Sequence, residues 1–224
     1  TLGLVGAVFQ SGLYHHGNMG LTKAIHKLAR PFCCSERLLI GDGFLGSPVK
    51  PEPSSPRYTK VKISPFVTEA IKQYYPLNKK NTEGGIDWLH VDLPIGMCTH
   101  IVGIAVGYSS NMLPRKMSDI KEYLDGKNKL LKPYFADFGG TVKKHPTMKK
   151  TWIISGQCDF DDKNMIIHIG DLPPLIRFDN FLKKLYLKMD ELGDDGKLDN
   201  DSSERVNLTI RWKNKSTWDE LKMM

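Results

Sequence analysis

The first thirty residues show the apolar spacing of two consecutive helices. Residues 2–10 can form a short helix, and residues 18–30 can form a second one after the turn SGLYHHG. The second segment carries apolar residues at the i, i+4 and i+7 positions of one helix face, and these are Leu21, Ile25 and Leu28. Asn18 is a favourable N-cap, and an Arg-Pro pair stops the helix at its other end. The pattern therefore predicts two helices across a short turn.

The next segment changes to the two-residue period of β-strands. An apolar run leads into GDGFLG at 41–46, which has the G-x-G-x-x-G spacing of a dinucleotide-binding turn. Such a turn must open a helix, but four prolines follow between residues 48 and 56 and exclude one. Residues 57–63 alternate as a half-buried strand does, and residues 64–80 have a helical pattern. Strand, stiff loop and strand after two helices predict a helix-turn-helix with a β wing.

A polar break at 81–85 precedes a part of the chain that is richer in strands. Its strand-like segments contain β-branched and aromatic residues between Gly, Pro, Asn or Asp, and they are 87–96, 100–110, 149–160 and 164–174. Helices are expected at 117–124 and 177–190. The acidic stretch 190–204 indicates a mobile hairpin loop before the strand RVNLTIRWK. We expect an α+β protein with a domain boundary near residue 84.

Composition and charge narrow the class of protein. Of the 224 residues, 40% are hydrophobic and 25% are charged, as in an ordinary globular protein, and no apolar run approaches a membrane span. The net charge of +7 suits a polyanionic partner. The cysteines form no C-x-x-C pair, so we expect a reduced, intracellular protein; they are Cys33, Cys34, Cys98 and Cys158. Because the first residue is Thr and the end follows a helix start, we expect part of a longer chain.

Several stretches form an ordered set of motifs along nearly the whole chain. They are LYHHGNMGLTKAIHKLARPF, GDGFLGS leading to SPRYT, DWLHVDLPIGMCTHIVGIAVGYSSNMLP, YFADFGGTV, WIISGQCDF and IHIGDLPP. This set resembles the breakage-reunion part of type IIA DNA topoisomerases: a Tyr-His-His-Gly turn with its helix, a glycine turn, an Arg-Tyr-Thr strand, a Gly-Ile-Ala-Val-Gly segment, and then the tower (shoulder) domain. The resemblance implies a winged-helix domain over 1–84 and an α/β tower domain over 85–224, closest to the eukaryotic and phage branch.

The resemblance implies that Tyr58 is a nucleophile. A tyrosine hydroxyl has a reference pKa of about 10 and reacts poorly unless its phenolate is favoured. The neighbouring Arg57 guanidinium can do this, and its planar fork suits the oxygens of a phosphodiester. By resemblance, Tyr58 attacks the DNA backbone and forms a transient 5′-phosphotyrosyl bond during double-strand breakage, passage and rejoining.

Four other residues are expected to act on DNA. His16 matches the position that the family uses close to the scissile phosphate, at a helix start that attracts anions, and is expected to relay a proton or bind the oxyanion. For His15 a structural role is as well supported as DNA binding. Lys60 is expected to bind DNA. Ile104 matches the isoleucine that wedges between base pairs, although without the resemblance a core isoleucine is the simpler interpretation.

The acidic clusters do not match a metal site. DFDD at 159–162 has the Asp-x-Asp of a magnesium-binding Toprim site but not its glycine-rich strand, and GDDGKLDNDSSE lacks the final Glu of a calcium loop. We expect a hairpin turn and a solvated loop. The resemblance implies that Mg²⁺ is held by a Toprim domain, and ATP by an ATPase domain, of a partner subunit or another domain. This chain alone is then expected to be inactive.

The resemblance also implies the partners. They are double-stranded DNA, the Toprim/ATPase subunit or domain, and a second copy of this subunit. No membrane is expected as a partner. The expected location is the cytoplasm or nucleoid, or the host cytoplasm for a phage or viral protein. Two alternatives stay open: a non-catalytic winged-helix DNA-binding module, and a degenerate subunit that kept the fold. Asn18, where the family has an acid, and Phe44, where gyrase has Asn, are the only hints of degeneration. SPRYT favours the enzyme, because a binding module has little reason to present Tyr beside Arg.

Overall fold

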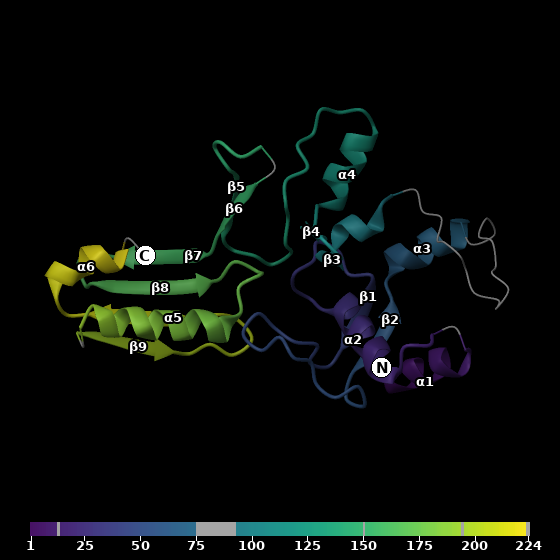
Figure 1. The fold of residues 1–224 in the computed structure, drawn as a ribbon, viewed down its shortest axis with the longest axis horizontal. Coiled ribbons are helices and arrows are strands. Elements are labelled where there is room, and N and C mark those ends of the chain that lie inside the picture. The colour runs from purple at the N-terminus through teal and green to yellow at the C-terminus, as the bar shows by residue number, and fades with distance from the viewer. Residues whose placement is uncertain (13, 75–92, 150, 194, 223–224) are drawn as a thin grey trace. The chain divides into compact units, whose positions relative to one another are not determined.

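The computed structural model describes residues 1–12, 14–74, 93–149, 151–193 and 195–222, and the chain forms two compact units (Figure 1). The first unit comprises Thr1–Gly46 and Glu52–Ala136, and the second comprises Ser47–Pro51 and Asp137–Met224. The expected boundary near residue 84 lies outside the described residues and stays a prediction.

The first unit begins with two helices and a two-stranded sheet, as the sequence predicted. These elements are α1 (Leu2–Gln10), α2 (Asn18–Ala29), β1 (Leu39–Asp42) and β2 (Lys60–Ile63). The strands are antiparallel, with Leu39 opposite Ile63 and Asp42 opposite Lys60. The helices pack on each other and on the inner side of this sheet through a small core of Val5, Leu21, Ile25, Val8, Tyr14, Leu39 and Val61. Burial of these apolar side chains holds the helix pair on the wing.

The buried face of α2 differs from the predicted one. Leu21 and Ile25 are buried as expected, but Leu28 is 37% exposed, and His26 and Ala29 are buried instead. The buried arc runs from Leu21 through Ile25 and Ala29 to His26, which leaves Leu28 at its edge. The predicted cap was also wrong, because the N-cap is Gly17, with φ of 82°, and no side chain caps the helix. Gly17 turns the chain into the helix one residue early, so that Asn18 is already helical.

The rest of the first unit consists of short elements. They are α3 (Pro65–Tyr74), the 3₁₀ turn η2 (Ile95–Cys98), β3 (Ile101–Ala105), β4 (Tyr108–Met112) and α4 (Met117–Leu124). The end of the helix expected over 64–80 and the start of the strand expected over 87–96 lie outside the described residues. The end of that predicted strand is wrong, since η2 replaces it: Pro94 has no N–H for a ladder, and its carbonyl accepts from the Met97 N–H.

The second unit is an antiparallel sheet of order β7-β8-β10-β9 covered by helices, with a separate β5–β6 hairpin (Figure 1). Its elements are β5 (Thr141–Lys144), β6 (Trp152–Ser155), β7 (Gln157–Asp161), β8 (Ile166–Asp171), α5 (Phe178–Glu191), β9 (Gly196–Asn200), β10 (Leu208–Trp212) and α6 (Lys215–Lys222). One face of the sheet packs on α5 and α6 through Ile167, Ile169, Leu208, Ile210, Phe178, Leu185, Met189 and Trp218. The predicted α+β class is confirmed.

The loop predicted over 190–204 is wrong in part, because β9 lies inside it. β9 is an edge strand paired with β10, and Leu198 lies opposite Ile210 and packs on the core. Its ladder bonds to β10 hold it in place despite its polar composition.

Candidate active site

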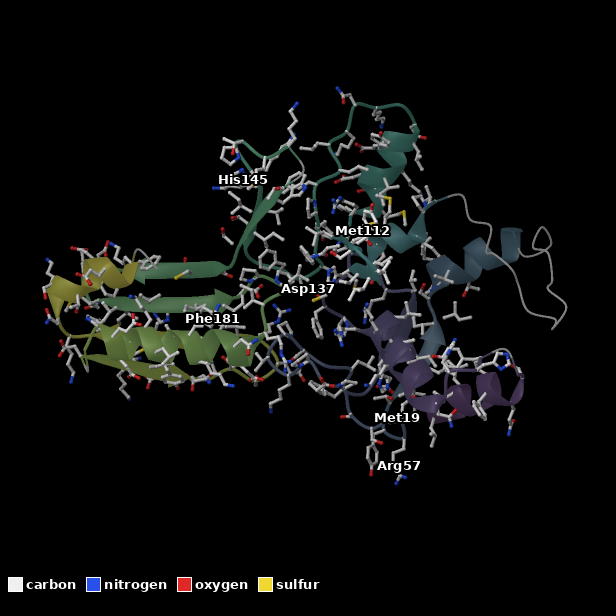
Figure 2. All side chains as sticks on the ribbon, viewed as in Figure 1. Met19, Arg57, Met112, Asp137, His145 and Phe181 are labelled. Atoms are coloured by element: carbon white, nitrogen blue, oxygen red, sulfur yellow. The ribbon has the colours of Figure 1, made fainter. Side chains whose placement is uncertain are left out.

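Arg57 and Tyr58 lie in a turn, where the sequence predicted the start of a strand. The Tyr58 N–H donates to the Ser55 carbonyl at 2.9 Å, and pairing with β1 begins only at Lys60. Pro56 suits the second position of this turn, and the Tyr58 N–H closes the turn onto Ser55, so pairing with β1 begins later than the expected residue 57. Figure 2 shows the Arg57 side chain pointing away from the ribbon. The candidate nucleophile is therefore presented by a turn that leads into β2.

Side-chain direction reverses between Tyr58 and Thr59. Tyr58 is 71% exposed, whereas Thr59 is 2% exposed. The Thr59 hydroxyl lies 3.0 Å from Nε2 of His26 on α2 and donates to the Thr1 hydroxyl at 2.8 Å. In addition, the Leu2 N–H donates to the Pro56 carbonyl at 3.2 Å. The phenol of Tyr58 thus faces solvent, while the next residue is anchored on both helices.

The glycine turn lies directly against the backbone of Tyr58. Gly43 has φ of 85°, a conformation that favours glycine, and a Cβ at this position would lie 2.6 Å from the Tyr58 carbonyl oxygen. The Gly43 N–H donates to the Asp42 carboxylate at 2.9 Å. The motif GDGFLG therefore supports the tyrosine turn, which explains its glycine without a dinucleotide.

His15 and His16 are exposed in the turn before α2. The rings of Tyr14 and His16 meet edge to face, with centroids 5.6 Å apart. The Tyr14 hydroxyl in turn packs where a side chain on Gly20 would clash, at 2.8 Å from an added Cβ. Because α2 has no side-chain cap and no acid in its first turn, its N-terminal amides can receive an anion. His16 is thus placed beside a helix end that favours phosphate.

Lys60 forms an exposed ion pair with Asp42, in which Nζ lies 3.9 Å from the carboxylate oxygen. Side chains exposed to 86% and 79% gain little from such a pair, so Lys60 can exchange Asp42 for another anion.

Ile104 lies on an exposed hairpin. β3 and β4 pair with Ile104 opposite Ser109, and Val106 and Gly107 form the connecting turn. Ile104 is 85% exposed and Tyr108 is 83% exposed. The simpler interpretation of Ile104 as a core residue is therefore wrong, and the hairpin presents apolar side chains to solvent, which is typical of a binding surface.

All the predicted site residues belong to the first unit. Within the described part of the chain, no hydrogen bond or ion pair joins the Tyr58 side chain to Arg57, His16 or Lys60. Two residues that hold the tyrosine turn were not predicted from the sequence, His26 and Thr59. A signal was available for His26, since it lies on the helix beside the apolar stripe, and a buried histidine needs a hydrogen-bond partner.

The described residues hold no group of three or more His, Cys, Asp or Glu that could bind a metal ion. The turn predicted at DFDD is wrong in part, because Asp159 to Asp161 are the last residues of β7 and the turn begins only at Asp162; Asp161 accepts hydrogen bonds from the N–H groups of Lys163 and Asn164. None of the four cysteines forms a disulfide, and burial raises the pKa of Cys33 and Cys34 to about 11. Neither of these two thiols is a thiolate nucleophile at neutral pH.

Comparison with known proteins agrees with these features. The family model for the A subunit of DNA gyrase/topoisomerase IV matches residues 2–223. DNA topoisomerase 2 of Acanthamoeba polyphaga mimivirus is 29% identical over 192 residues, covering 80% of this chain and 15% of that protein. The A subunit of DNA gyrase from Borreliella burgdorferi is 27% identical over 229 residues, covering 89% of this chain and 28% of that protein.

The fold also matches a solved structure. The Plasmodium falciparum topoisomerase II DNA-binding, cleavage and re-ligation domain superposes with a TM-score of 0.83 at 21% identity, covering 98% of this chain and 32% of that one. The described residues include no helix that is long and apolar enough to cross a membrane. The chain spans less than a third of the length of each of these relatives. It belongs to the family formed by the A subunits of DNA gyrase and topoisomerase IV.

Proposed function

We propose that this chain is the DNA-cleaving part of an ATP-dependent type IIA DNA topoisomerase and that Tyr58 is its nucleophile. The observation that carries the proposal is the exposed Tyr58 beside Arg57, on a turn whose next residue is 2% exposed and hydrogen-bonded to a helix. An exposed phenol on a rigid support can meet a backbone phosphate without rearrangement of the chain. Family membership supports the same reaction class.

In the proposed reaction the Tyr58 oxygen forms a bond to phosphorus while the bond from phosphorus to the 3′ oxygen of the neighbouring nucleotide breaks. The phenol loses its proton, the 3′ oxygen leaves as a hydroxyl, and the 5′ phosphate stays on Tyr58. One phosphate ester replaces another, so attack by the 3′ hydroxyl can reverse the step. Arg57 would bind the phosphate oxygens as charge develops on them, and His16 would relay the proton or bind the oxyanion.

We assign the remaining contacts with DNA to Lys60, His15 and Ile104. Lys60 and His15 are exposed and can bind backbone phosphates. Ile104 would wedge between base pairs from the tip of the β3–β4 hairpin, which costs stacking energy and returns a bent duplex that contacts more protein.

Mg²⁺ and ATP would be bound by a Toprim domain and an ATPase domain of a partner subunit or another domain, since no acidic cluster of the described residues fits a metal ion. When bound there, Mg²⁺ would supply charge stabilisation at the phosphate. We further propose a homodimer that cuts both strands of double-stranded DNA, in the cytoplasm or nucleoid, or in the host cytoplasm for a viral protein.

The test combines the full-length protein with its Toprim/ATPase partner, supercoiled DNA and Mg²⁺, followed by a detergent quench. We expect protein attached to 5′ DNA ends in the wild type and in Tyr123→Phe, a control at another exposed tyrosine of the first unit. Tyr58→Phe should abolish the attachment and bind DNA nearly as before. Covalent trapping that survives in Tyr58→Phe would disprove the assignment.

Clean DNA binding without any covalent species in the wild type would favour the two alternatives instead. A winged-helix binding module would show steep salt dependence of affinity and nothing more. A degenerate subunit would behave likewise in spite of the shared fold.

A further inference from the structure

The residue after the candidate nucleophile is one of the few polar residues buried in the first unit. Thr59 is 2% exposed, and its hydroxyl lies 3.0 Å from Nε2 of His26 and 2.8 Å from the Thr1 hydroxyl. A buried hydroxyl that lost its partners would keep its desolvation cost, so these bonds fix the position of Thr59. Since one peptide bond joins Thr59 to Tyr58, they also limit where the phenol can lie.

His26 suits this role because its surroundings keep it neutral. It is 4% exposed on α2, and burial lowers its pKa, with the positive charge of Arg30 acting in the same direction. A neutral imidazole offers one donor and one acceptor, so the tautomer with its proton on Nε2 donates to the Thr59 hydroxyl while that hydroxyl donates to Thr1. The pair joins residues 33 positions apart in sequence, which makes it a tertiary link and not part of the local turn.

We propose that His26 and Thr59 are positioning residues that hold Tyr58 in the geometry required for attack on DNA. This inference rests on the proposed function of Tyr58. It identifies α2 as the element that connects the parts of the site. The N-terminal end of α2 follows His16 and carries the open amides, and its buried arc carries the histidine that holds the tyrosine turn. The nucleophile and the phosphate-binding end are then held by one helix.

The test measures the rate of covalent attachment at saturating DNA, the DNA affinity and the melting temperature of the full-length protein with its Toprim/ATPase partner and Mg²⁺. Thr59→Val keeps the shape of the side chain and removes the hydroxyl, and His26→Leu removes the imidazole. Each should slow covalent attachment roughly 10- to 100-fold, as expected for a misplaced reacting group. DNA affinity should stay within about twofold of the wild type, because both side chains are buried.

Rescue separates positioning from a general loss of stability. Thr59→Ser restores the hydroxyl, and His26→Gln restores a polar group that can reach the position of Nε2, so both should recover most of the rate. The double variant Thr59→Val with His26→Leu should be no slower than either single variant, because both break the same bond. Thr209→Val is the control: its hydroxyl is also buried and lies 3.1 Å from a histidine, His168, but in the second unit.

Any of three results would overturn the positioning role. These are wild-type rates of attachment in Thr59→Val and His26→Leu, multiplied losses of rate in the double variant, and an equal loss of rate in Thr209→Val. If Thr59→Val does not fold, the comparison of His26→Leu with His26→Gln decides. If Tyr58→Phe still forms the covalent attachment, Tyr58 is not the nucleophile. If Tyr58→Phe abolishes the attachment but Thr59→Val does not slow it, only the positioning role is overturned.

Discussion

Replacing Gly43 with alanine tests whether the glycine turn supports the nucleophile. Gly43 has φ of 85°, and an added Cβ would lie 2.6 Å from the carbonyl oxygen of Tyr58. Ordinary contact begins at 3.4 Å, so the gap is about 0.8 Å too small. Because the opposing atom belongs to the backbone, the strain cannot be relieved by a side-chain rotation and must move the tyrosine turn.

Two costs add at this position. The left-handed backbone disfavours a side chain by about 1–2 kcal/mol, and forcing an extra carbon into a packed site costs about 1–3 kcal/mol more. We therefore expect Gly43→Ala to lose about 2–5 kcal/mol of unfolding free energy. Displacement of the turn should also slow covalent attachment to DNA by roughly 10- to 100-fold.

Gly126→Ala is a control for the backbone cost alone. Gly126 has φ of 81° in the same unit, and no atom lies within 4 Å of an added Cβ. This variant should lose only about 1–2 kcal/mol and cleave DNA at the wild-type rate. Urea unfolding followed by far-UV circular dichroism gives the stability difference, and the detergent-quenched cleavage assay gives the rate.

The reasoning fails if the two alanine variants lose the same stability and both cleave normally. The close approach of Gly43 to Tyr58 would then be absent in solution, and the turn would owe its glycine to φ alone. A loss of stability in Gly43→Ala without a loss of cleavage would show that the turn can move without consequence for the phenol.

Two more predictions concern the exposed hairpin and the buried histidine. Ile104→Ala should leave the melting temperature within about 2 °C of the wild type, because the side chain is 85% exposed. The variant should reduce the bending of bound DNA, which energy transfer between labelled DNA ends measures. Unchanged bending would contradict the proposed insertion of Ile104 between base pairs. The pKa of His26 in the folded state lies below its ordinary value of 6.5, so the unfolded chain takes up the proton at a higher pH than the folded chain. The free energy of unfolding should therefore fall as the pH drops below about 6.5, and it should level off below the folded-state pKa. Urea titrations from pH 8 to 4.5 should show this loss in the wild type and a smaller one in His26→Gln; identical profiles would refute it.

Elements with a strong periodic pattern were predictable from the sequence. The helix expected over 117–124 is α4 with the same bounds, and the helix expected over 177–190 is α5 shifted by one residue. Both carry apolar residues on one face and are bounded by polar or turn-forming residues, so local information is sufficient. Other predictions went wrong for physical reasons outside the pattern. The turn from Ser55 to Tyr58 delays β2 until Lys60, and part of the predicted loop 190–204 forms β9 because β10 offers it a free edge.

In the candidate site, too, the sequence indicates local features but not contacts between distant residues. The proposed roles of Tyr58 and Arg57 rest on a motif that is local in the sequence. The His26–Thr59 pair could not be predicted, because it joins residues 33 apart and depends on how α2 packs against the turn. The prediction placed Leu28 in the buried face, and the structure replaces it with His26 and Ala29. Because the predicted face had the wrong edge, the sequence did not indicate His26, which bonds to the residue after the candidate nucleophile.

The contacts around Tyr58 share one property that bears on how the site works. Gly43 lies against its carbonyl oxygen, Ser55 accepts its N–H, and Thr59 fixes the following peptide through His26. Each contact acts on the backbone or on a neighbour, and within the described residues none engages the phenol. Changes to the supports should therefore lower cleavage and stability together, whereas Tyr58→Phe should lower cleavage alone. In the proposed reaction, a nucleophile held in this way would be fixed in space before DNA arrives, and its reactive oxygen would stay free to form the bond to phosphorus.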